Sequence, residues 1–288
     1  MDRRFFLKTV NLAAGAALVG KCAQAAEPQA GGTVIEQIGV LVDTTVCEGC
    51  QSCEYICAET NGLPEPDVDD SAFDSERKTS ETQWTLVNRF QTSKGEVYAK
   101  RQCMHCDQPA CASACLTKAM SKTPRGPVVW NSDKCMGCRF CMISCPYDMP
   151  KFEYNSPVPK LQKCRLCLDR LQEGEQPACA ENCPAEALTF GRKTDLLDIA
   201  RARIANEPDK YVHHIYGEHE AGGTGWLYLA SVPFEELGFR KDIGTKPYPE
   251  LTKEFLYGVP VVITLLPPFL LALSNATRKD NQKTEGDH

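Results

Sequence analysis

Apolar positions in this chain of 288 residues fall in short runs separated by glycine, proline and acidic residues. The run Gly-Val-Leu-Val at residues 39–42 predicts a buried strand. Two β-rich runs at residues 84–90 and 96–99 flank a Ser-Lys-Gly turn and predict a hairpin. Residues 128–130 predict a further strand, and residues 185–191 predict a strand that ends at a glycine. We therefore expect short strands joined by long polar segments, within an α+β fold.

A packing helix is predicted after the last of these strands. Thr194 is the expected N-cap, and Asp195 lies in the first turn. Leu196, Ala200 and Ile204 then fall on one face at helical spacing. Such a face is more typical of packing than of a functional site.

A long apolar run near the C-terminus has a different character. Residues 255–273 contain no charged side chain over nineteen positions, which is just long enough to cross a bilayer. Pro260, Pro267 and Pro268 interrupt it, and lipid-buried helices tolerate proline where neighbouring helices satisfy the freed carbonyl groups. We predict a transmembrane helix that packs against another membrane subunit. The alternative, a buried core helix, is disfavoured by the three prolines and the terminal position.

The charges that follow this run indicate its orientation. Arg278, Lys279 and Lys283 lie in residues 274–288. By the positive-inside rule this segment is predicted to be a cytoplasmic tail. The bulk of the chain then lies on the periplasmic face of the cytoplasmic membrane.

The N-terminus supports the same location. Arg3 and Arg4 precede Phe-Phe-Leu-Lys, a mild apolar run and Ala-Gln-Ala. This pattern predicts a twin-arginine signal peptide over residues 1–26, because the apolar run is too short to form a stable bilayer span. An ordinary amphipathic helix is the alternative. Twin-arginine export carries folded proteins, which suits a protein loaded with a cofactor before export.

Cysteine content changes the picture most. The chain has 17 cysteines, so either metal or a disulfide framework must account for them. Cys22 lies in the predicted signal peptide and would leave with it, so sixteen remain. The formal net charge of −6 gives no indication of a nucleic-acid partner.

The sixteen cysteines fall in four runs. Residues 135–145 read C-x2-C-x2-C-x3-C and precede Pro146, which is the bacterial ferredoxin ligand pattern for a [4Fe–4S] cluster. Residues 47–57 repeat the spacing without the proline, residues 103–115 widen one gap to four residues, and residues 164–183 carry an insertion. Three thiolates of each run are expected to bind one cluster. The fourth, predicted at the head of a following helix, is expected to bind the cluster of another run.

The pairing of runs follows from their order. The second and third runs are close in sequence and should form an inner ferredoxin-like unit, around which the first and fourth close as a second unit. We therefore predict four [4Fe–4S] clusters in two interlocked bacterial-ferredoxin-like units, plus the C-terminal transmembrane helix. The predicted ligand sets, each named here by its first cysteine, are the Cys103 site (Cys103, Cys106, Cys111 and Cys145), the Cys135 site (Cys135, Cys138, Cys141 and Cys115), the Cys47 site (Cys47, Cys50, Cys53 and Cys183) and the Cys164 site (Cys164, Cys167, Cys179 and Cys57).

Other uses of the cysteines fit less well. Structural zinc uses CxxC pairs separated by a longer loop, whereas three of these runs crowd their cysteines together. Cysteines three apart on a tight loop rarely reach disulfide geometry. A catalytic cluster would need one open iron site, and therefore a cube held by only three protein ligands. Each predicted set has four. No nucleotide fingerprint or catalytic triad order is present, so no catalytic residue is predicted.

Three further groups of residues have an expected role. Residues 64–76 are acidic and rich in turn residues, which predicts a surface loop. Histidines 213, 214 and 219 are predicted to be structural or exposed. Six basic residues beside the cysteine runs either offset the clusters' negative charge or are solvated surface charges: Lys100, Arg101, Lys134, Arg139, Lys163 and Arg165.

The predicted organisation assigns each part of the chain a role. The segments are 1–26 (signal peptide), 33–102 (first run, acidic insertion and hairpin), 103–150 (inner unit), 151–198 (fourth run and packing helix), 199–254 (C-terminal extension), 255–273 (transmembrane helix) and 274–288 (tail).

The stretches Cys-Pro-Tyr at 145–147 and Lys-Cys-Arg-Leu-Cys-Leu-Asp-Arg at 163–170, with the widened second run, resemble the four-cluster subunits of membrane-bound respiratory oxidoreductases. The resemblance is strong over residues 38–198. A twin-arginine signal with a C-terminal anchor is most similar to the iron–sulfur subunit of hydrogenase-2-type uptake [NiFe] hydrogenases. The β subunit of membrane-bound formate dehydrogenase is the alternative.

This resemblance implies an electron-transfer subunit that is not an enzyme by itself. It implies relay of single electrons between a periplasmic catalytic subunit, of hydrogenase or formate dehydrogenase type, and an integral membrane quinone-reactive or cytochrome b subunit. Membrane lipid is the remaining expected partner.

Overall fold

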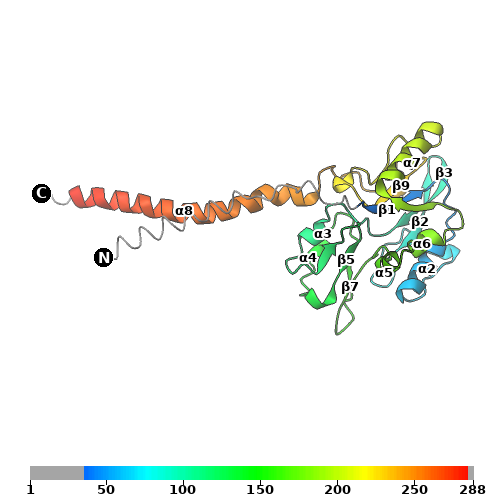
Figure 1. Ribbon diagram of the computed structural model, residues 1–288, viewed down its shortest axis with the longest axis horizontal. Coiled ribbons are helices and arrows are strands. Elements are labelled where there is room, and N and C mark those ends of the chain that lie inside the picture. Colours follow the sequence, from blue (N-terminus) through cyan, green and yellow to red (C-terminus); the bar gives the residue numbers. More distant parts are fainter. Residues whose placement is uncertain (1–35, 285–288) are drawn as a thin grey trace. The chain divides into compact units, whose positions relative to one another are not determined.

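The computed structural model describes residues 36–284, with side chains described to residue 275 (Figure 1). The predicted signal peptide lies outside these residues. The described part contains both helices and short strands, as an α+β chain should.

The strands are mostly short. They are β1 (Ile38–Asp43), β2 (Leu86–Thr92), β3 (Gly95–Arg101), β4 (Met120–Lys122), β5 (Val128–Trp130), β6 (Lys151–Phe152), β7 (Leu161–Gln162), β8 (Leu188–Arg192) and β9 (Trp226–Leu229). The helices are α2 (Ser52–Asn61), α3 (Ala110–Ser113), α4 (Phe140–Ile143), α5 (Leu168–Gln172), α6 (Ala178–Glu181), α7 (Lys193–Asn206) and α8 (Tyr248–Thr284). Single 3₁₀ turns are η1 (Asp70–Phe73), η2 (Ser132–Lys134), η3 (Glu220–Gly222) and η4 (Phe234–Leu237).

A three-stranded sheet divides the interior. Its order is β8-β1-β9, with β1 antiparallel to β8 and parallel to β9. Successive side chains of a strand point to opposite faces. Val40 and Val42 therefore share a core with Cys53 and Cys179, whereas Leu41 packs on the other face. The strand predicted at residues 39–42 is confirmed, and one of its faces lies toward the cysteine runs.

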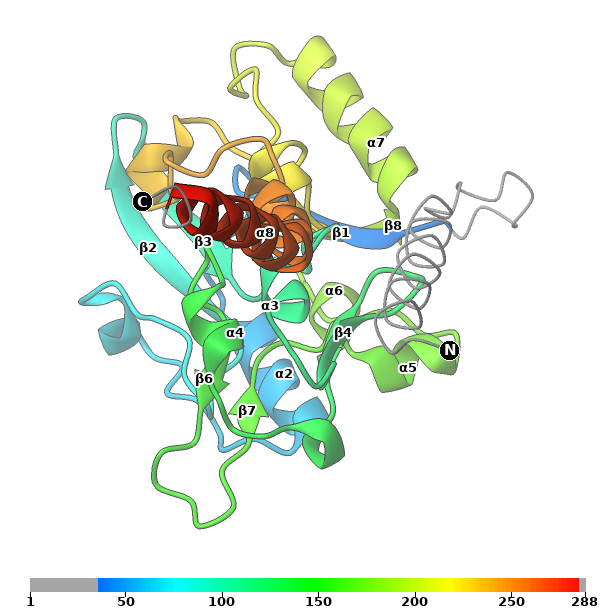
Figure 2. The ribbon, with the colours of Figure 1, turned by 90° about the vertical axis from the view of Figure 1, so that its left-hand side faces the viewer.

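Helix α7 covers the second face of this sheet (Figure 2). Leu196 and Ala200 are buried against Leu41, as the predicted packing face requires. The predicted N-cap is wrong, however. β8 runs directly into α7, so Arg192 is the extended capping residue and Thr194 lies within the first turn.

Two other sequence predictions are confirmed. β2 and β3 form the expected hairpin, with Leu86 opposite Arg101 at its base and Thr92 opposite Gly95 at its turn. Residues 64–76 are largely exposed and contain only the single turn η1, so this acidic segment is a surface loop.

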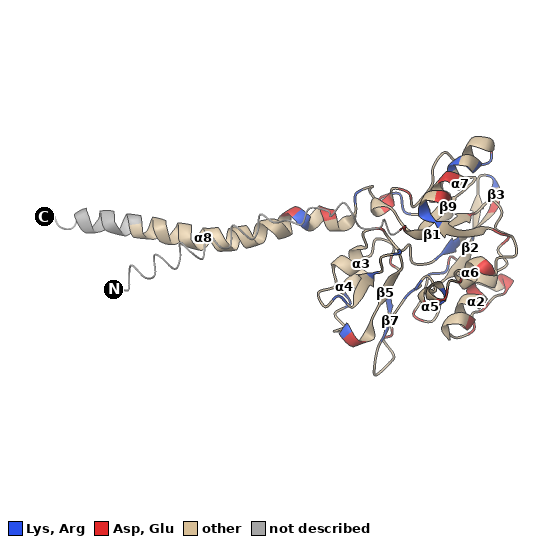
Figure 3. Ribbon diagram, in the orientation of Figure 1, with Lys and Arg blue, Asp and Glu red and all other residues tan. Residues whose placement is uncertain are grey.

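The C-terminal helix extends the predicted span at both ends. Within α8, residues Tyr248–Asn275 are long and apolar enough to cross a membrane. None of its apolar window is buried in the protein, so the alternative of a core helix does not hold. Figure 3 shows charged residues at the start of α8, which are Lys and Glu in the sequence, and none along its middle.

Candidate metal centres

The four CxxC loops share one backbone feature. The residue two positions after the first cysteine has a positive φ in every loop, at 71° for Gly49, 47° for His105, 71° for Gly137 and 53° for Leu166. A left-handed residue in a tight turn directs successive backbone N–H groups toward one point, which creates a concavity suited to an anion such as an Fe–S cluster. His105 and Leu166 adopt this conformation without the freedom of glycine, so the packing around them must hold the turn in place.

Short helices bring the runs together in pairs. α2, which contains Cys53, packs on α6, which contains Cys179. α3, which contains Cys111, packs on α4, which contains Cys141. The first run therefore contacts the fourth, and the second contacts the third.

One detail of the expected motif is wrong. The fourth cysteine of a run does not stand at the head of a following helix. Cys145 comes after α4 ends at Ile143, and Cys115 and Cys183 follow α3 and α6 in the same way. The reason is that each of these helices begins one residue before the third cysteine of its run and lasts only about one turn. In the first run α2 is longer and includes Cys57.

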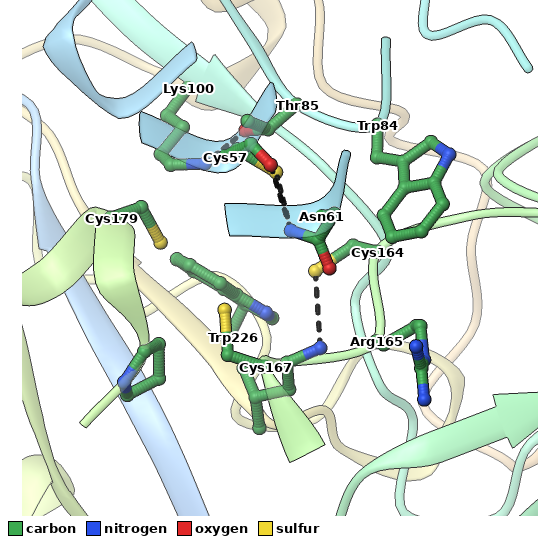
Figure 4. A pocket seen from close by; sticks show the side chains of 12 residues that line it. Cys57, Asn61, Trp84, Thr85, Lys100, Cys164, Arg165, Cys167, Cys179 and Trp226 are labelled. Carbon is green, nitrogen blue, oxygen red and sulfur yellow. Dashed lines mark hydrogen bonds between the residues drawn. The ribbon is translucent and has the colours of Figure 1, made fainter. Parts of the chain in front are cut away.

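Figure 4 shows a cavity lined by all four cysteines of the Cys164 site. Cys164 and Cys167 come from the loop before α5, Cys179 from α6, and Cys57 from the distant helix α2. The backbone N–H of Leu166 donates to Cys164 Sγ at 3.4 Å, as expected for a loop that wraps its own thiolate.

A second cavity is lined by all four cysteines of the Cys47 site. Cys183 reaches it from the loop after α6, while the other three come from the first run. Both cavities therefore contain three cysteines of one run and the last cysteine of another.

The remaining two sets are recognised by their mutual electrostatic effects. Burial raises the pKa of the Cys106 thiol well above its usual value, and Cys145, Cys103 and Cys111 raise it further. These four are the Cys103 site.

Cys141 behaves in the same way within the Cys135 site. Burial raises the pKa of Cys141 to about 11, with further contributions from Cys115, Cys135 and Cys138. The structure thus brings each predicted set of four into one neighbourhood.

These neighbourhoods suit a cluster better than a single ion. Within residues 36–284, no three His, Cys, Asp or Glu side chains converge closely enough to hold one metal ion. A cube holds its four thiolates on four different irons, so its ligands stand farther apart than those of one ion.

Electrostatics also indicates that these thiols bind metal. Burial raises the pKa of Cys47 to about 11 and that of Cys57 to about 12. Ligation requires thiolates, and the positive charge of bound metal is what makes them stable in such buried positions.

The side chain of Trp226 contributes a polar atom to the first cavity. The indole Nε1 of Trp226 is buried and has no hydrogen-bond partner, and its ring lies among the four cysteine sulfurs (Figure 4). Hydrogen bonds to cluster sulfurs are a known means of setting cluster potentials. The donor fits a sulfur-rich guest, and no sequence pattern distinguished this tryptophan beforehand.

His105 was also missed by the sequence analysis. It is buried between Cys103 and Cys106, and its Nδ1 accepts a hydrogen bond from the Val128 N–H at 2.8 Å. Burial, together with the charge of Lys163, holds its pKa well below the usual value, so the ring is neutral. Its position in a CxxC gap was the only available signal.

The six basic residues separate into two groups. Lys100 and Lys163 are only 2 % and 4 % exposed. Arg101 donates to the Leu237 carbonyl and lies over the Phe239 ring. The other three remain accessible to solvent: Lys134, Arg139 and Arg165.

The clustered histidines are structural or exposed, as expected. His214 bonds Glu220 Oε1 at 2.8 Å and packs edge-on against Phe234, while the side chain of His219 is 68 % exposed.

Four CxxC loops, four sets of neighbouring thiols and N–H donors directed toward them together define an iron–sulfur electron-transfer protein. The chain matches the 4Fe-4S dicluster domain family over residues 96–193. It is 44% identical to a protein from Nitratidesulfovibrio vulgaris over 98% of this chain and 78% of that one.

Two further relatives are more informative by name. The chain is 34% identical to the hydrogenase-2 operon protein HybA of Escherichia coli O157:H7, over 100% of this chain and 99% of that protein. It is 31% identical to the iron–sulfur subunit of the nitrate-inducible formate dehydrogenase of Escherichia coli K12, over 67% and 68% respectively. The chain belongs to the family of hydrogenase-2-type iron–sulfur subunits, which confirms the resemblance drawn from its motifs.

Proposed function

We propose that this chain relays single electrons through four [4Fe–4S] clusters, held by the Cys47, Cys164, Cys103 and Cys135 sites with their crossed fourth ligands. The observation that carries the proposal is the pair of cavities, each lined by three cysteines of one run and the last cysteine of the other. When bound, a fully ligated cluster takes up and passes on one electron and offers no open position to a substrate.

Neighbouring cysteines suggest the order of the sites. Burial raises the pKa of Cys111 to about 12, and Cys141, a ligand of the Cys135 site, adds to the rise. Burial likewise raises the pKa of Cys164, with a contribution from Cys103.

The Cys164 and Cys47 sites are inferred to be neighbours in the same way. Burial raises the pKa of Cys53, with a contribution from Cys179. The order is then Cys135 site, Cys103 site, Cys164 site and Cys47 site. Cys138 and Cys50, in the first and last of these, are exposed, so electrons can enter and leave at the two ends.

The protein side chains have distinct tasks in this relay. Sixteen thiolates fix the clusters, and the left-handed CxxC loops direct N–H groups toward them. Apolar residues such as Val40, Val42 and Met104 exclude water from the interior. Excluding water lowers the reorganisation energy of each electron transfer.

We further propose that the relay connects a periplasmic [NiFe] hydrogenase catalytic subunit to an integral membrane quinone-reactive or cytochrome b subunit, with α8 as the membrane anchor. The near full-length match to HybA supports this choice. A formate dehydrogenase catalytic subunit is the second candidate, supported by the match over 67% of the chain.

The test is a measurement of iron on the purified full chain, together with its spectrum. We expect about sixteen irons per chain and a broad visible absorption that dithionite bleaches. Markedly fewer irons would refute the four-cluster relay. Mass spectrometry of the large subunit that co-purifies from native membranes then decides between the two catalytic partners.

A further inference from the structure

We propose that Lys100 is an internal counter-charge shared by the Cys47 and Cys164 sites, which raises the reduction potentials of both clusters together. This inference rests on the proposed function. It assigns a role to a single side chain that lies between two cluster sites.

The position of Lys100 is what distinguishes it. It lies near the end of β3, at the base of the hairpin and away from its turn, and it lines both cavities, the one of the Cys164 site and the one of the Cys47 site. Figure 4 shows its side chain beside Cys57 and Thr85. Among the six basic residues near the cysteine runs, it is the one that lines both cavities.

Lys100 also lacks the usual partner of a buried cation. Its ammonium donates to Thr85 Oγ1 and lies 5.1 Å from the centre of the Trp226 ring. Within residues 36–284 no carboxylate forms an ion pair with it. Burial removes the hydration of an ammonium, so a buried cation is stable only with compensating charge or polar contacts. Anionic guests in the two cavities beside Lys100 would supply that charge.

The charge of Lys100 can act on both sites because its side chain shares one cavity with Cys57 and Cys179 and the other with Cys47 and Cys53.

The sign of the effect follows from the charges. Each cluster gains one negative charge on reduction, and a fixed positive charge between them stabilises the reduced forms. Removing that charge should lower both potentials. The Cys103 and Cys135 sites, whose cysteines do not line either cavity, should be little affected.

The experiment compares Lys100→Met, Lys100→Arg and Lys160→Met in the full chain with its clusters in place. Methionine keeps the length of the buried side chain without its charge, and Thr85 Oγ1 retains its own hydrogen bond to the Arg101 carbonyl at 3.2 Å. Lys160 is exposed and serves as the matched control. Each variant is titrated potentiometrically, with the reduced clusters followed by electron paramagnetic resonance.

In Lys100→Met we expect two of the four reduction equilibria to shift at least tenfold toward the oxidised form, which is about 59 mV for one electron. Lys100→Arg should retain the wild-type potentials, and Lys160→Met should move none. Four unchanged potentials in Lys100→Met with full iron content would overturn the proposal, as would the same drop in Lys100→Arg.

The iron content of Lys100→Met and of the wild-type chain also tests the proposal. If Lys100→Met loses iron, a loss of about eight irons confined to the Cys47 and Cys164 sites supports the shared role, while a loss spread over all four sites contradicts it. A wild-type chain with markedly fewer than about sixteen irons refutes the relay itself, which separates that failure from a failure of the inference about Lys100.

Discussion

The carboxylate of Glu54 accepts hydrogen bonds from both terminal nitrogens of Arg77, at 2.7 and 3.0 Å. It also accepts the backbone N–H of Val87 at 2.7 Å. Glu54 is buried in α2, next to Cys53, so this ion pair fastens the first cysteine run to the β2–β3 hairpin. The pair is a structural clamp, because its members are already satisfied by one another.

We expect Glu54→Ala to destabilise the protein by about 3–5 kcal/mol, because it leaves the partly buried Arg77 charge without its partner and the Val87 N–H without its acceptor. The measurement is a urea unfolding curve of the cluster-loaded chain without oxygen. Glu207→Gln, which breaks the exposed pair of Glu207 with Lys210, should change stability by less than about 1 kcal/mol. Equal effects of the two variants would contradict the clamp.

Crossed ligation can be tested by combining cysteine substitutions. Cys183→Ser should remove about four irons, and adding Cys47→Ser should remove no more, since both belong to one site. Adding Cys179→Ser instead should remove about eight in total. Iron analysis of the three variants distinguishes the partitions. If Cys183 served the site of its own run, the combination with Cys179 would cost only about four.

Gly49 and Gly137 occupy equivalent left-handed positions in different surroundings. A Cβ on Gly49 would collide with the Tyr98 ring, whereas one on Gly137 would meet nothing within 4 Å. Gly137→Ala should therefore cost only the backbone strain, about 1–2 kcal/mol. Gly49→Ala should cost a further 1–3 kcal/mol, roughly, for the collision.

The double variant Gly49→Ala/Tyr98→Ala separates the two contributions in the same unfolding experiment. Relative to Tyr98→Ala alone, the added alanine should then cost no more than it does at Gly137. A collision cost that persists without the ring would show that the contact with Tyr98 is irrelevant.

Trp226 and Trp84 line the same cavity and form a matched pair. The Trp84 Nε1 already donates to the Glu81 carbonyl at 3.2 Å, while the Trp226 Nε1 has no partner. Trp226→Phe should lower the potential of one cluster, that of the Cys164 site, because it removes an N–H donor from the cluster sulfurs. Trp84→Phe should leave all four potentials unchanged. Potentiometric titration checks both, and a shift of similar size in Trp84→Phe would exclude the hydrogen bond as the cause.

The apolar part of α8 makes a separate prediction. Leu265→Arg places a charge in the middle of the span, which costs about 2.5–3.5 kcal/mol of insertion free energy. The chain expressed without partner subunits should then leave the membrane pellet during an alkaline carbonate wash. Leu251→Arg lies next to Lys253, outside the charge-free run, and should stay in the pellet. Retention of both variants would argue against a spanning helix.

Cysteine spacing was enough to locate the candidate sites, because ligand geometry on a tight loop restricts the spacing itself. The strand at residues 39–42 and the hairpin were also predictable, since their patterns are local. The N-cap of α7 was not. Thr194 has the right chemistry, but β8 leads into the helix without a break and fixes the start at Lys193.

Sequence could not separate the six basic residues either. Lys100 and Lys134 both stand within a few positions of a cysteine, yet one is 2 % exposed and the other lies on the surface. The difference arises because the hairpin folds its inner face onto the first and fourth runs, which are far apart in the chain. The same long-range packing places Trp226 in a cavity, and no local sequence pattern around it predicts that position.

The crossed position of Cys57 and Cys183 has a mechanical consequence. If each set of four holds a cube, the metal joins the segment before the acidic loop to the segment after residue 164 at two separate places. A single protease cut in residues 64–76 would then leave both pieces attached to each other until the iron is stripped. The loaded protein behaves as a cross-linked chain, with iron and sulfide in the role that disulfides have elsewhere.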